Sequence, residues 1–309
     1  APKQLTTTLL AENARTIIAR NDSPDIGFDR SINPYRGCEH GCIYCYARPT
    51  HAYYGLSPGL DFESKLFFKP QAETLLAREL SKPGYEVKPI HIGGNTDVYQ
   101  PQERLLGVTR RILQTMQAFN HPLSIITKSA LIVRDADILG AMGKAGLARA
   151  SVSITTLDRK LARSMEPRAA TPEKRFEAVS RLTEAGCPTS VNFAPVIPGL
   201  NDHELEAVLA RAKAALPLSE LEASAKAAPK VRGFAAALDA KAAHDIAIDK
   251  WRWLIKSETS QCPHCITPYT RQGQQFLFMI WKNTTVMRHD STSRSEEHTS
   301  ELQSHLMIS

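Results

Sequence analysis

The stretch Gly37–Tyr46, GCEHGCIYCY, places three cysteines within eight residues at the spacings C-x3-C-x2-C. On a continuous helix, the first and last of these thiols would stand about 10 Å apart along the axis and could not converge on one small group. Gly37 and Gly41 instead favour a loop, in which the thiols can turn toward a common point. Clustered thiols in a chain with six cysteines predict a metal site in a reducing, cytoplasmic setting rather than a disulfide scaffold.

The number of ligands separates two kinds of metal site. Structural zinc takes four ligands, and His40 or His51 could supply the fourth. An iron–sulfur cubane held by three thiolates leaves one iron without a protein ligand, and a vacant coordination position lets a small molecule bind the metal. The cysteines alone therefore leave both a zinc-binding module and an open iron–sulfur cluster as interpretations.

Alternating β-like and helical runs surround the cysteine motif. The predicted strands are Arg30–Asn33, Pro89–Gly94, Pro122–Ser129, Arg149–Asp158 and Pro188–Ile197. Apolar residues at helical spacing predict helices over 105–119, from Thr171 with Pro172 at its first position, and from Leu205 with Asn201 or Asp202 as its cap. This alternation predicts a parallel sheet with helices outside it, and the polar strand ends gather where barrel-like folds place their sites.

Longer strings carry a family resemblance. They are the cysteine motif with Tyr44 just before its last cysteine, GGNTDVYQPQE, TKSALIVRD, SITTLD with MEPRAATPEKR, and APVIPGLND. Together these strings resemble radical S-adenosylmethionine (SAM) enzymes, and specifically the spore-photoproduct-lyase-like branch, over about residues 11–215. The resemblance implies an α/β fold, a partial (β/α)6 barrel, which here lacks a normal last strand and ends in an irregular C-terminal tail.

The resemblance also implies the cofactors. Cys38, Cys42 and Cys45 would bind a [4Fe-4S] cluster whose open iron chelates SAM. One electron, supplied by a donor of the flavodoxin or ferredoxin type, would cleave SAM to methionine and a 5′-deoxyadenosyl radical that removes a hydrogen atom from the substrate. The resemblance names no substrate and no further catalytic residue.

Contacts to SAM are implied at the strand ends. The implied residues are Tyr44, Gly93, Gly94, Asn95, Lys128, Ser153 and Ile197. Tyr44 and Ile197 would lie against the adenine, and the Gly93–Asn95 backbone would meet the SAM amino group. Lys128, Ser153 and their neighbours Ser129 and Thr155 would reach the carboxylate or the ribose.

Other residues keep two interpretations. Glu166 and Arg168 would form an ion pair or face the site. The residues His51, Tyr53 and Tyr54 would contact substrate or pack the cysteine loop. Cys187 is expected to be a buried structural thiol.

Composition suggests where the domain begins and ends. We expect an N-terminal extension over 1–27, the barrel over 28–215, and a non-native or frameshifted segment over 216–293. Residues 294–309 resemble a translated sequencing adapter and are excluded from fold reasoning. Without a sixth strand the chain would be catalytically incomplete. The late pair Cys262 and Cys265 is either half a zinc site or, as we favour, a chance occurrence.

Three functions compete at this point. The first is a radical SAM enzyme with an unidentified substrate, and the second is repair of a DNA photoproduct, which would need a further hydrogen-donating cysteine such as Cys187. The third is a non-catalytic zinc module. A net charge of +6 without a Lys/Arg run of five or more supports a nucleic-acid partner only weakly, and no segment is apolar for long enough to predict a membrane span. The absence of G-x-G-x-x-G after a strand disfavours a Rossmann dehydrogenase.

Overall fold

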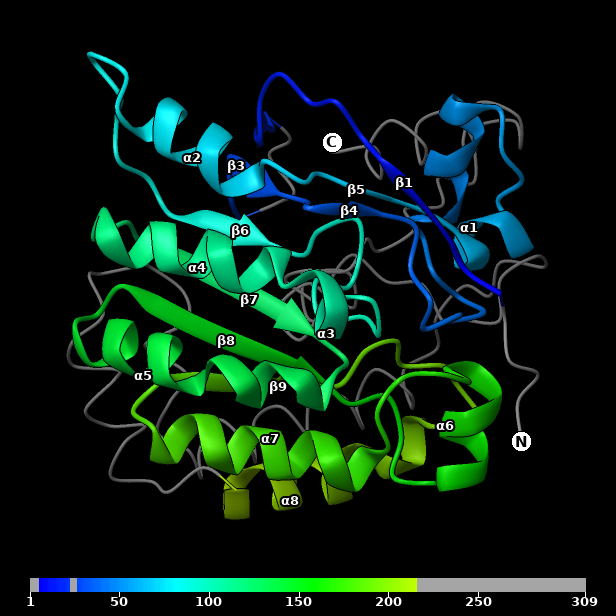
Figure 1. Ribbon diagram of the computed structural model, residues 1–309. Coiled ribbons are helices and arrows are strands. Elements are labelled where there is room, and N and C mark those ends of the chain that lie inside the picture. The colour runs from blue at the N-terminus through cyan, green and yellow to red at the C-terminus, as the bar shows by residue number, and fades with distance from the viewer. Residues whose placement is uncertain (1–5, 23–26, 216–309) are drawn as a thin grey trace, which may run out of the picture.

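A computed structural model describes residues 6–22 and 27–215 (Figure 1). The segments 216–293 and 294–309, together with Cys262 and Cys265, lie outside the described residues. Within the described part, no helix combines the length and the apolar character needed to cross a membrane.

One sheet of six strands forms the centre of the fold, in the order β2-β3-β6-β7-β8-β9. Its strands are β2 (Ile18–Arg20), β3 (Arg30–Ile32), β6 (Ile90–Ile92), β7 (Leu123–Thr127), β8 (Ala148–Ser153) and β9 (Thr189–Asn192). All pairs from β3 to β9 are parallel, so the five predicted strands and the predicted parallel sheet are confirmed. The antiparallel edge strand β2 was not predicted, and it comes from the N-terminal extension.

Helices cover one face of this sheet, as Figure 1 shows. They are α2 (Ala72–Leu80), α4 (Val108–Ala118), α5 (Ala136–Lys144) and α7 (Pro172–Glu184), with α8 (Leu205–Ala215) packed against α7. The predicted start of α7 is confirmed, with Thr171 at the N-cap and Pro172 in the first turn. This arrangement is the α/β partial barrel that the sequence predicts.

Two helix boundaries differ from the prediction. The predicted helix over 105–119 is divided at Gly107, whose φ of 61° ends the short helix α3 (Glu103–Leu106) before α4 begins. Neither Asn201 nor Asp202 caps a helix with its side chain, because a 3-10 turn, η3 (Asp202–Glu204), precedes α8. The Asn201 Oδ1 atom accepts a hydrogen bond from the Ile197 N–H at 2.6 Å, and the Asp202 carboxylate accepts one from the Gly199 N–H at 2.8 Å.

A second, smaller sheet was missed in the sequence. It has the order β1-β5-β4, from β1 (Thr8–Ala11), β5 (Lys65–Phe68) and β4 (Tyr35–Arg36), with α1 (Leu60–Ser64) directly before β5. Lys69 follows β5, and its buried ammonium donates to the Asn33 carbonyl at 2.9 Å. This bond joins the small sheet to the C-terminal end of β3, just before β4 and the cysteine loop.

Along the strands of the large sheet, apolar side chains point to one face and polar side chains to the other. Ile90 and Ile92 are fully buried in the core under the helices, whereas His91 between them points to the other face and its Nδ1 contacts the Ser124 Oγ at 2.9 Å. Further along the sheet, the hydroxyls of Ser151 and Ser190 bond to each other at 2.7 Å on that same second face. A parallel sheet buried on both faces would be apolar throughout. The face that no described helix covers is therefore a polar surface inside the partial barrel.

The packing of α5 leads to a stability prediction. A Cβ added to Gly143 would lie 2.5 Å from the Gly186 carbonyl oxygen and 2.7 Å from the Cys187 Cα, so backbone would have to move. We expect Gly143→Ala to lower the free energy of unfolding by about 1–3 kcal/mol, measured by urea denaturation. Helix propensity alone would raise it by about 1 kcal/mol. A more stable variant would therefore contradict the close approach.

Candidate functional site

The three clustered cysteines lie in a loop between β4 and the 3-10 helix η1 (Arg48–Tyr54). Gly37 and Gly41 adopt φ values of 78° and 68°, in the left-handed region that favours glycine. A Cβ on Gly37 would lie 2.7 Å from the Phe62 carbonyl oxygen, and one on Gly41 would overlap the Arg168 guanidinium. The predicted loop is thus confirmed, and both glycines are required by conformation and by crowding.

The three thiols lie close enough to affect one another electrostatically. Burial, followed by the charges of Asp97 and the other two cysteines, raises the pKa of Cys38 well above its usual range. Burial also raises the pKa of Cys42 to about 12, and it raises that of Cys45. All three thiols are therefore protonated near neutral pH without a metal, and metal binding would displace their protons.

Backbone amides and one lysine act in the opposite direction. The His40 N–H bonds the Cys38 sulfur, and the N–H groups of Ala47 and Arg48 bond the Cys45 sulfur, which lowers the pKa of each thiol. The positive charge of Lys128 lowers the pKa of Cys42. These groups are preorganised to stabilise thiolates once a metal group is bound.

The spacing of the donors distinguishes a cluster from a single ion. Among the described residues, no three His, Cys, Asp or Glu side chains converge closely enough to hold one metal ion. A tetrahedral zinc would need thiolates about 3.8 Å apart, given a Zn–S distance of about 2.3 Å. A cubane takes each thiolate on a different iron and so accepts a wider separation. The three cysteines therefore suit a cluster better than a single zinc.

The two histidines that could complete a zinc site have other partners. The His40 Nδ1 lies 3.3 Å from the Asp97 carboxylate, and the His51 Nε2 lies 2.9 Å from the Lys65 carbonyl oxygen. His51 is buried and packs edge-on against Phe62, with ring centroids 5.0 Å apart. Its role is to pack the loop.

Asp97 connects three segments around the site. Its side chain is 9% exposed and accepts hydrogen bonds from the Thr127 hydroxyl at 2.6 Å, the Lys128 N–H at 2.7 Å and the Tyr99 N–H at 2.9 Å. Burial alone would raise the pKa of Asp97, but the pairing with His40 and these donors hold it well below its usual range. Sequence reasoning missed this role, although the position of Asp97 just after a predicted strand and two glycines was a usable signal.

Further bonds fasten the loop after β6 to the cysteine loop. The Thr96 hydroxyl donates to the Gly37 carbonyl at 2.7 Å, and the Gln100 amide donates to the same oxygen at 3.3 Å. The Gln100 carbonyl oxygen in turn accepts the Glu39 N–H at 3.0 Å. The GGNTDVYQ string therefore has a structural reason to accompany the cysteine motif.

Gly93, Gly94 and Asn95 lie where the sequence predicts, at the end of β6. Gly93 has a φ of 100°, and a Cβ there would stand 2.9 Å from a backbone oxygen of β7. The Gly94 carbonyl accepts the Tyr46 hydroxyl, and the Asn95 N–H donates to the Asn33 Oδ1 at 2.8 Å. The structure thus brings Gly94 beside the residue that follows Cys45, and Tyr46 and Asn33 are contacts that the sequence did not reveal.

A second polar cluster surrounds Tyr44. The Tyr44 hydroxyl donates to the Glu166 carboxylate, which also accepts the Thr155 hydroxyl at 2.6 Å and pairs with the buried guanidinium of Arg175. The Lys128 ammonium lies 5.7 Å from the centre of the Tyr44 ring. Burial would raise the pKa of Glu166, but Arg175 and Lys128 lower it, so this carboxylate is ionised.

Of the two interpretations of Glu166 and Arg168, the ion pair between them is wrong, because each residue has a different partner. Glu166 pairs with Arg175, whereas Arg168 pairs with Glu63 and donates to the Glu39 carbonyl. Arg168 therefore anchors the cysteine loop, and Glu166 faces the site. Arg175 lies nine residues further along the chain from Glu166, and sequence reasoning missed it.

Ser153 and Ile197 lie at the same end of the sheet. Ser153 ends β8, is 3% exposed, and its carbonyl accepts the Arg175 guanidinium at 2.9 Å. Ile197 is half-buried in the loop after β9, and Asn201 ties this loop to the Thr155 carbonyl at 2.7 Å. Ser129 caps the turn after β7 by accepting the Leu131 N–H at 3.2 Å.

Several residues do not reach the site. Tyr54 packs against Phe67 with ring centroids 4.8 Å apart, and Tyr53 is exposed. Cys187 is 1% exposed just before β9, at the N-terminal ends of the strands and opposite the cysteine loop. Its prediction as a buried thiol is confirmed.

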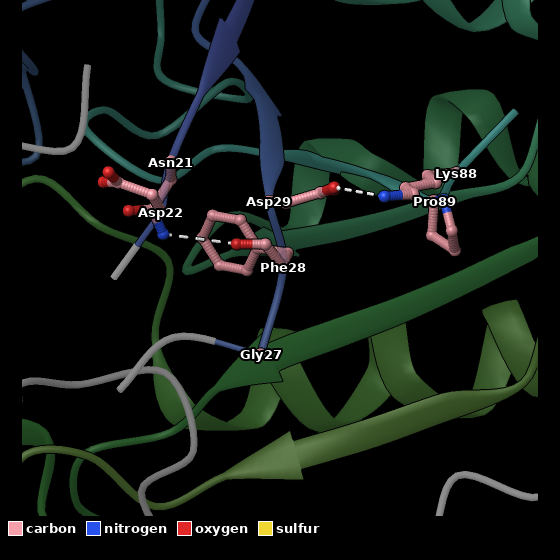
Figure 2. A pocket seen from close by; sticks show the side chains of 7 residues that line it. All are labelled: Asn21, Asp22, Gly27, Phe28, Asp29, Lys88 and Pro89. Atoms are coloured by element: carbon pink, nitrogen blue, oxygen red, sulfur yellow. Dashed lines mark hydrogen bonds and ion pairs between the residues drawn. The ribbon is translucent and has the colours of Figure 1, made fainter. Parts of the chain in front are cut away.

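A separate hollow of about 450 Å³ also lies at the N-terminal ends of the strands (Figure 2). Asn21, Phe28 and Asp29 line it beside Lys88, which forms a 3.2 Å ion pair with Asp29. Because these residues precede β3 and β6, the hollow is distinct from the cysteine loop.

A family model for the radical SAM superfamily matches residues 32–212, more than half of the chain. The chain belongs to the radical SAM superfamily. Enzymes of this superfamily use a [4Fe-4S] cluster and SAM, and they need an electron donor. The matched region begins at the end of β3 and ends in α8, so it contains every residue of the cysteine loop.

Proteins of a bacterium and of an archaeon are similar to the chain in sequence. The chain is 35% identical over 175 residues to an uncharacterised protein of Mycobacterium bovis, covering 57% of this chain and 52% of that protein. It is 31% identical over 173 residues to an uncharacterised protein of Methanocaldococcus jannaschii, covering 56% and 62%. The chain therefore spans about half the length of the mycobacterial relative.

Solved structures of spore photoproduct lyase share the fold. A mutant of that lyase has a TM-score of 0.52 at 20% identity, covering 69% of this chain and 59% of the lyase. A mutant with a dinucleoside spore photoproduct has a TM-score of 0.53 at 16% identity, covering 97% and 79%. At such identities the likeness shows the fold alone, and it confirms the predicted α/β partial barrel.

The contacts of Asp97 lead to a stability prediction. At pH 7, Asp97→Asn should lower the free energy of unfolding by about 1–3 kcal/mol, because a buried network loses its charged acceptor. The pKa of Asp97 is depressed in the folded protein, so its contribution is present above about pH 4 and is lost as the pH falls toward the folded value. The difference in the free energy of unfolding between wild type and Asp97→Asn should therefore become smaller below about pH 4.

Urea denaturation at pH 7 and at pH 3.5 measures both effects. Asp137→Asn is the matched control, because Asp137 is exposed and its ion pair with Arg110 lies at the surface. If the two variants lose equal stability, Asp97 does not hold the segments together.

Proposed function

We propose that Cys38, Cys42 and Cys45 hold a [4Fe-4S] cluster and that the protein reductively cleaves SAM to abstract hydrogen from a substrate. The observation that supports this most directly is that Cys42 and Cys45 lie close enough to Cys38 to raise its pKa, in a chain of the radical SAM superfamily whose described residues form no single-ion site. When bound, the cluster would supply one electron to SAM, which yields methionine and a 5′-deoxyadenosyl radical. We place this activity in residues 28–215 and in a reducing, cytoplasmic setting.

The surrounding chain would hold and shield the metal group. The amide groups of His40, Ala47 and Arg48 are already directed at sulfur, so little reorganisation is needed when the thiols ionise. Arg48 donates to the Cys42 carbonyl at 2.9 Å, which fixes the turn between the second and third ligands. Burial of Cys38 and Cys42 keeps water away from their sulfurs.

SAM would be bound by groups at the strand ends. The half-buried ammonium of Lys128 forms no ion pair with any carboxylate of the described residues, so it is available to a ligand carboxylate. Tyr44 and Ile197 offer apolar surface to the adenine, and the Gly94–Asn95 backbone lies next to Tyr46 for the amino group. We propose that Ser153 lines the same pocket, beside Arg175.

Glu166 would act as a fixed polar support and not as a proton carrier. Its carboxylate accepts bonds from Tyr44, Thr155 and Arg175, so its ionised form is stabilised. In this state it holds the Tyr44 hydroxyl and so fixes the ring that would lie against the ligand. The lyase or oxidoreductase character of the whole reaction depends on the substrate.

The two rival functions have less support. A photoproduct-repair reaction of the expected kind would need a hydrogen-donating cysteine near the cluster, and Cys187 lies at the opposite end of the strands. A single-zinc module would need convergent ligands, which the described residues do not contain. Incubation with ultraviolet-damaged DNA tests the first alternative, and zinc content tests the second.

The cluster assignment predicts the behaviour of cysteine variants. After anaerobic reconstitution with iron and sulfide, the wild type should be brown and should form 5′-deoxyadenosine from SAM when dithionite is added. Cys42→Ala should lose both properties, because one iron loses its only protein ligand. Absorption spectra and chromatography of 5′-deoxyadenosine measure these outcomes.

Cys187→Ala is the matched control and should keep both colour and SAM cleavage, because Cys187 lies far from the loop. Colour and cleavage that survive in Cys42→Ala would overturn the ligand assignment. A colourless wild type with one bound zinc would favour the zinc module.

The role of Lys128 leads to a separate prediction about SAM affinity. Lys128→Met should raise the dissociation constant of SAM about tenfold, because one charge-assisted contact of about 1.5 kcal/mol is removed. Cluster absorption should remain, since Lys128 is not a ligand. Equilibrium binding of SAM to the reconstituted protein measures the effect, with the exposed Lys213→Met as control. Equal affinities in the two variants would exclude Lys128 from the SAM site.

A further inference from the structure

We propose that a surface over the cysteine loop, made by Ile43, Leu60, Lys160 and Arg163, docks an acidic one-electron carrier protein. We call these residues the donor face. The proposal rests on the proposed function, because only a protein with a redox cluster at this loop needs an electron from outside. It adds the place of entry and the charge of the partner.

The apolar part of the donor face covers the loop directly. Ile43 stands between Cys42 and Cys45 in the chain, yet its side chain is 66% exposed. Leu60 is 61% exposed at the start of α1, and the Arg48 guanidinium links the preceding residue, Gly59, to the Cys42 carbonyl through bonds of 3.0 Å and 2.9 Å. Two large apolar side chains are thus presented to solvent within a few residues of the thiols.

Helix α6 (Arg159–Met165) supplies the positive charge. The Ile43 N–H donates to the Met165 carbonyl at 3.0 Å, so this helix borders the loop. Figure 1 shows α1 and α6 on the same side of the molecule. Lys160 and Arg163 are exposed on α6, and neither forms an ion pair with a carboxylate of the described residues.

The acidic groups near this surface already have partners. Glu63 pairs with Arg48 and Arg168, and Glu173 pairs with Arg159. Asp61 pairs with Lys65 at 3.1 Å, and the Asp158 carboxylate accepts the backbone N–H of Lys160 at 2.7 Å. Asp158 is paired with no cation among the described residues, but Lys160 and Arg163 outnumber it, so the surplus charge at the donor face is positive.

These features match a transient redox partner better than a substrate. Electron-transfer encounters bury small interfaces, below about 1,200 Å², and rely on complementary charge for rapid association. A few exposed apolar side chains with surplus positive charge suit a small acidic carrier. The Tyr44 hydroxyl bonds the buried Glu166 and the Lys128 ammonium lies beside the ring, so ligand and carrier would approach from different sides.

The test compares two sources of electrons in the reconstituted full chain. Lys160→Glu/Arg163→Glu reverses the charge of the donor face, and Lys82→Glu/Lys213→Glu reverses the same number of exposed charges elsewhere. Formation of 5′-deoxyadenosine is measured with reduced flavodoxin, an acidic carrier, and with dithionite. We expect the KM for flavodoxin to rise on the order of tenfold in the donor-face variant and to stay near wild type in the control.

The reaction with dithionite distinguishes failure of the donor face from failure of the proposed function. Its rate should be unchanged in both variants, because a small reductant needs no docking surface. The donor face alone would be overturned if dithionite-driven SAM cleavage were normal and the KM for flavodoxin were unchanged in the donor-face variant. An equal rise in this KM in the donor-face and control variants would overturn it as well. No cleavage by the wild type with dithionite would instead overturn the proposed function.

Two further measurements support the assignment. The wild-type KM for flavodoxin should rise with ionic strength, since exposed charges are screened. Lys160→Gln/Arg163→Gln should show a smaller rise in KM than the charge reversal, and it guards against misfolding of α6. A DNA duplex that competes with flavodoxin only when the donor-face charges are intact would assign the surface to nucleic acid and overturn the proposal.

Discussion

The site depends on one buried contact, the pairing of Asp97 with His40. Asp97 belongs to the loop after β6, His40 lies between two of the clustered cysteines, and the same carboxylate accepts bonds from Thr127 and Lys128 at the end of β7. Because the Asp97 carboxylate has little exposure to water, its oxygens need hydrogen-bond donors from the protein. The segments that supply these donors are therefore held in one relative position. The shape of the cysteine loop is therefore set by the sheet as well as by its own glycines.

The large sheet contributes through the difference between its two faces. Ile90 and Ile92 fix β6 in the core under the helices, and His91 and Ser124 lie on the opposite, polar face. Because side chains alternate along a strand, each apolar residue that holds a strand in place also presents a polar neighbour to the barrel interior. The hydrophobic core and the polar lining of the site are thus two results of one sequence pattern.

The sequence predicts the large sheet well because its signal is local. Short apolar runs bounded by Pro and Gly, such as those around Ile90 and Leu123, mark strands, and Pro172 marks a helix start. The small sheet was missed because β4 has two residues and β1 lies at a largely exposed edge, so neither shows a clear alternation. The cysteine loop itself was predictable from spacing and glycines, whereas the pairs Asp97–His40 and Glu63–Arg168 join residues far apart in the chain. Such pairs are decided by packing, and one sequence holds no local signal for them.

Among the described residues, charged side chains on both sides of the cysteine loop divide into paired and unpaired groups. On the inner side, the carboxylate of Glu166 is neutralised by Arg175, and the ammonium of Lys128 is left beside Tyr44. On the outer side, Glu63 is neutralised by Arg48 and Arg168, and the cations of α6 are left at the surface. Buried carboxylates must be paired to remain ionised, so arginines on both sides of the loop form ion pairs within the protein. Lys128, Lys160 and Arg163 are not used in this way within the described part of the chain and can bind anions from outside the protein. Lys128 would bind a ligand carboxylate within the barrel, and Lys160 and Arg163 would bind an acidic protein at the surface.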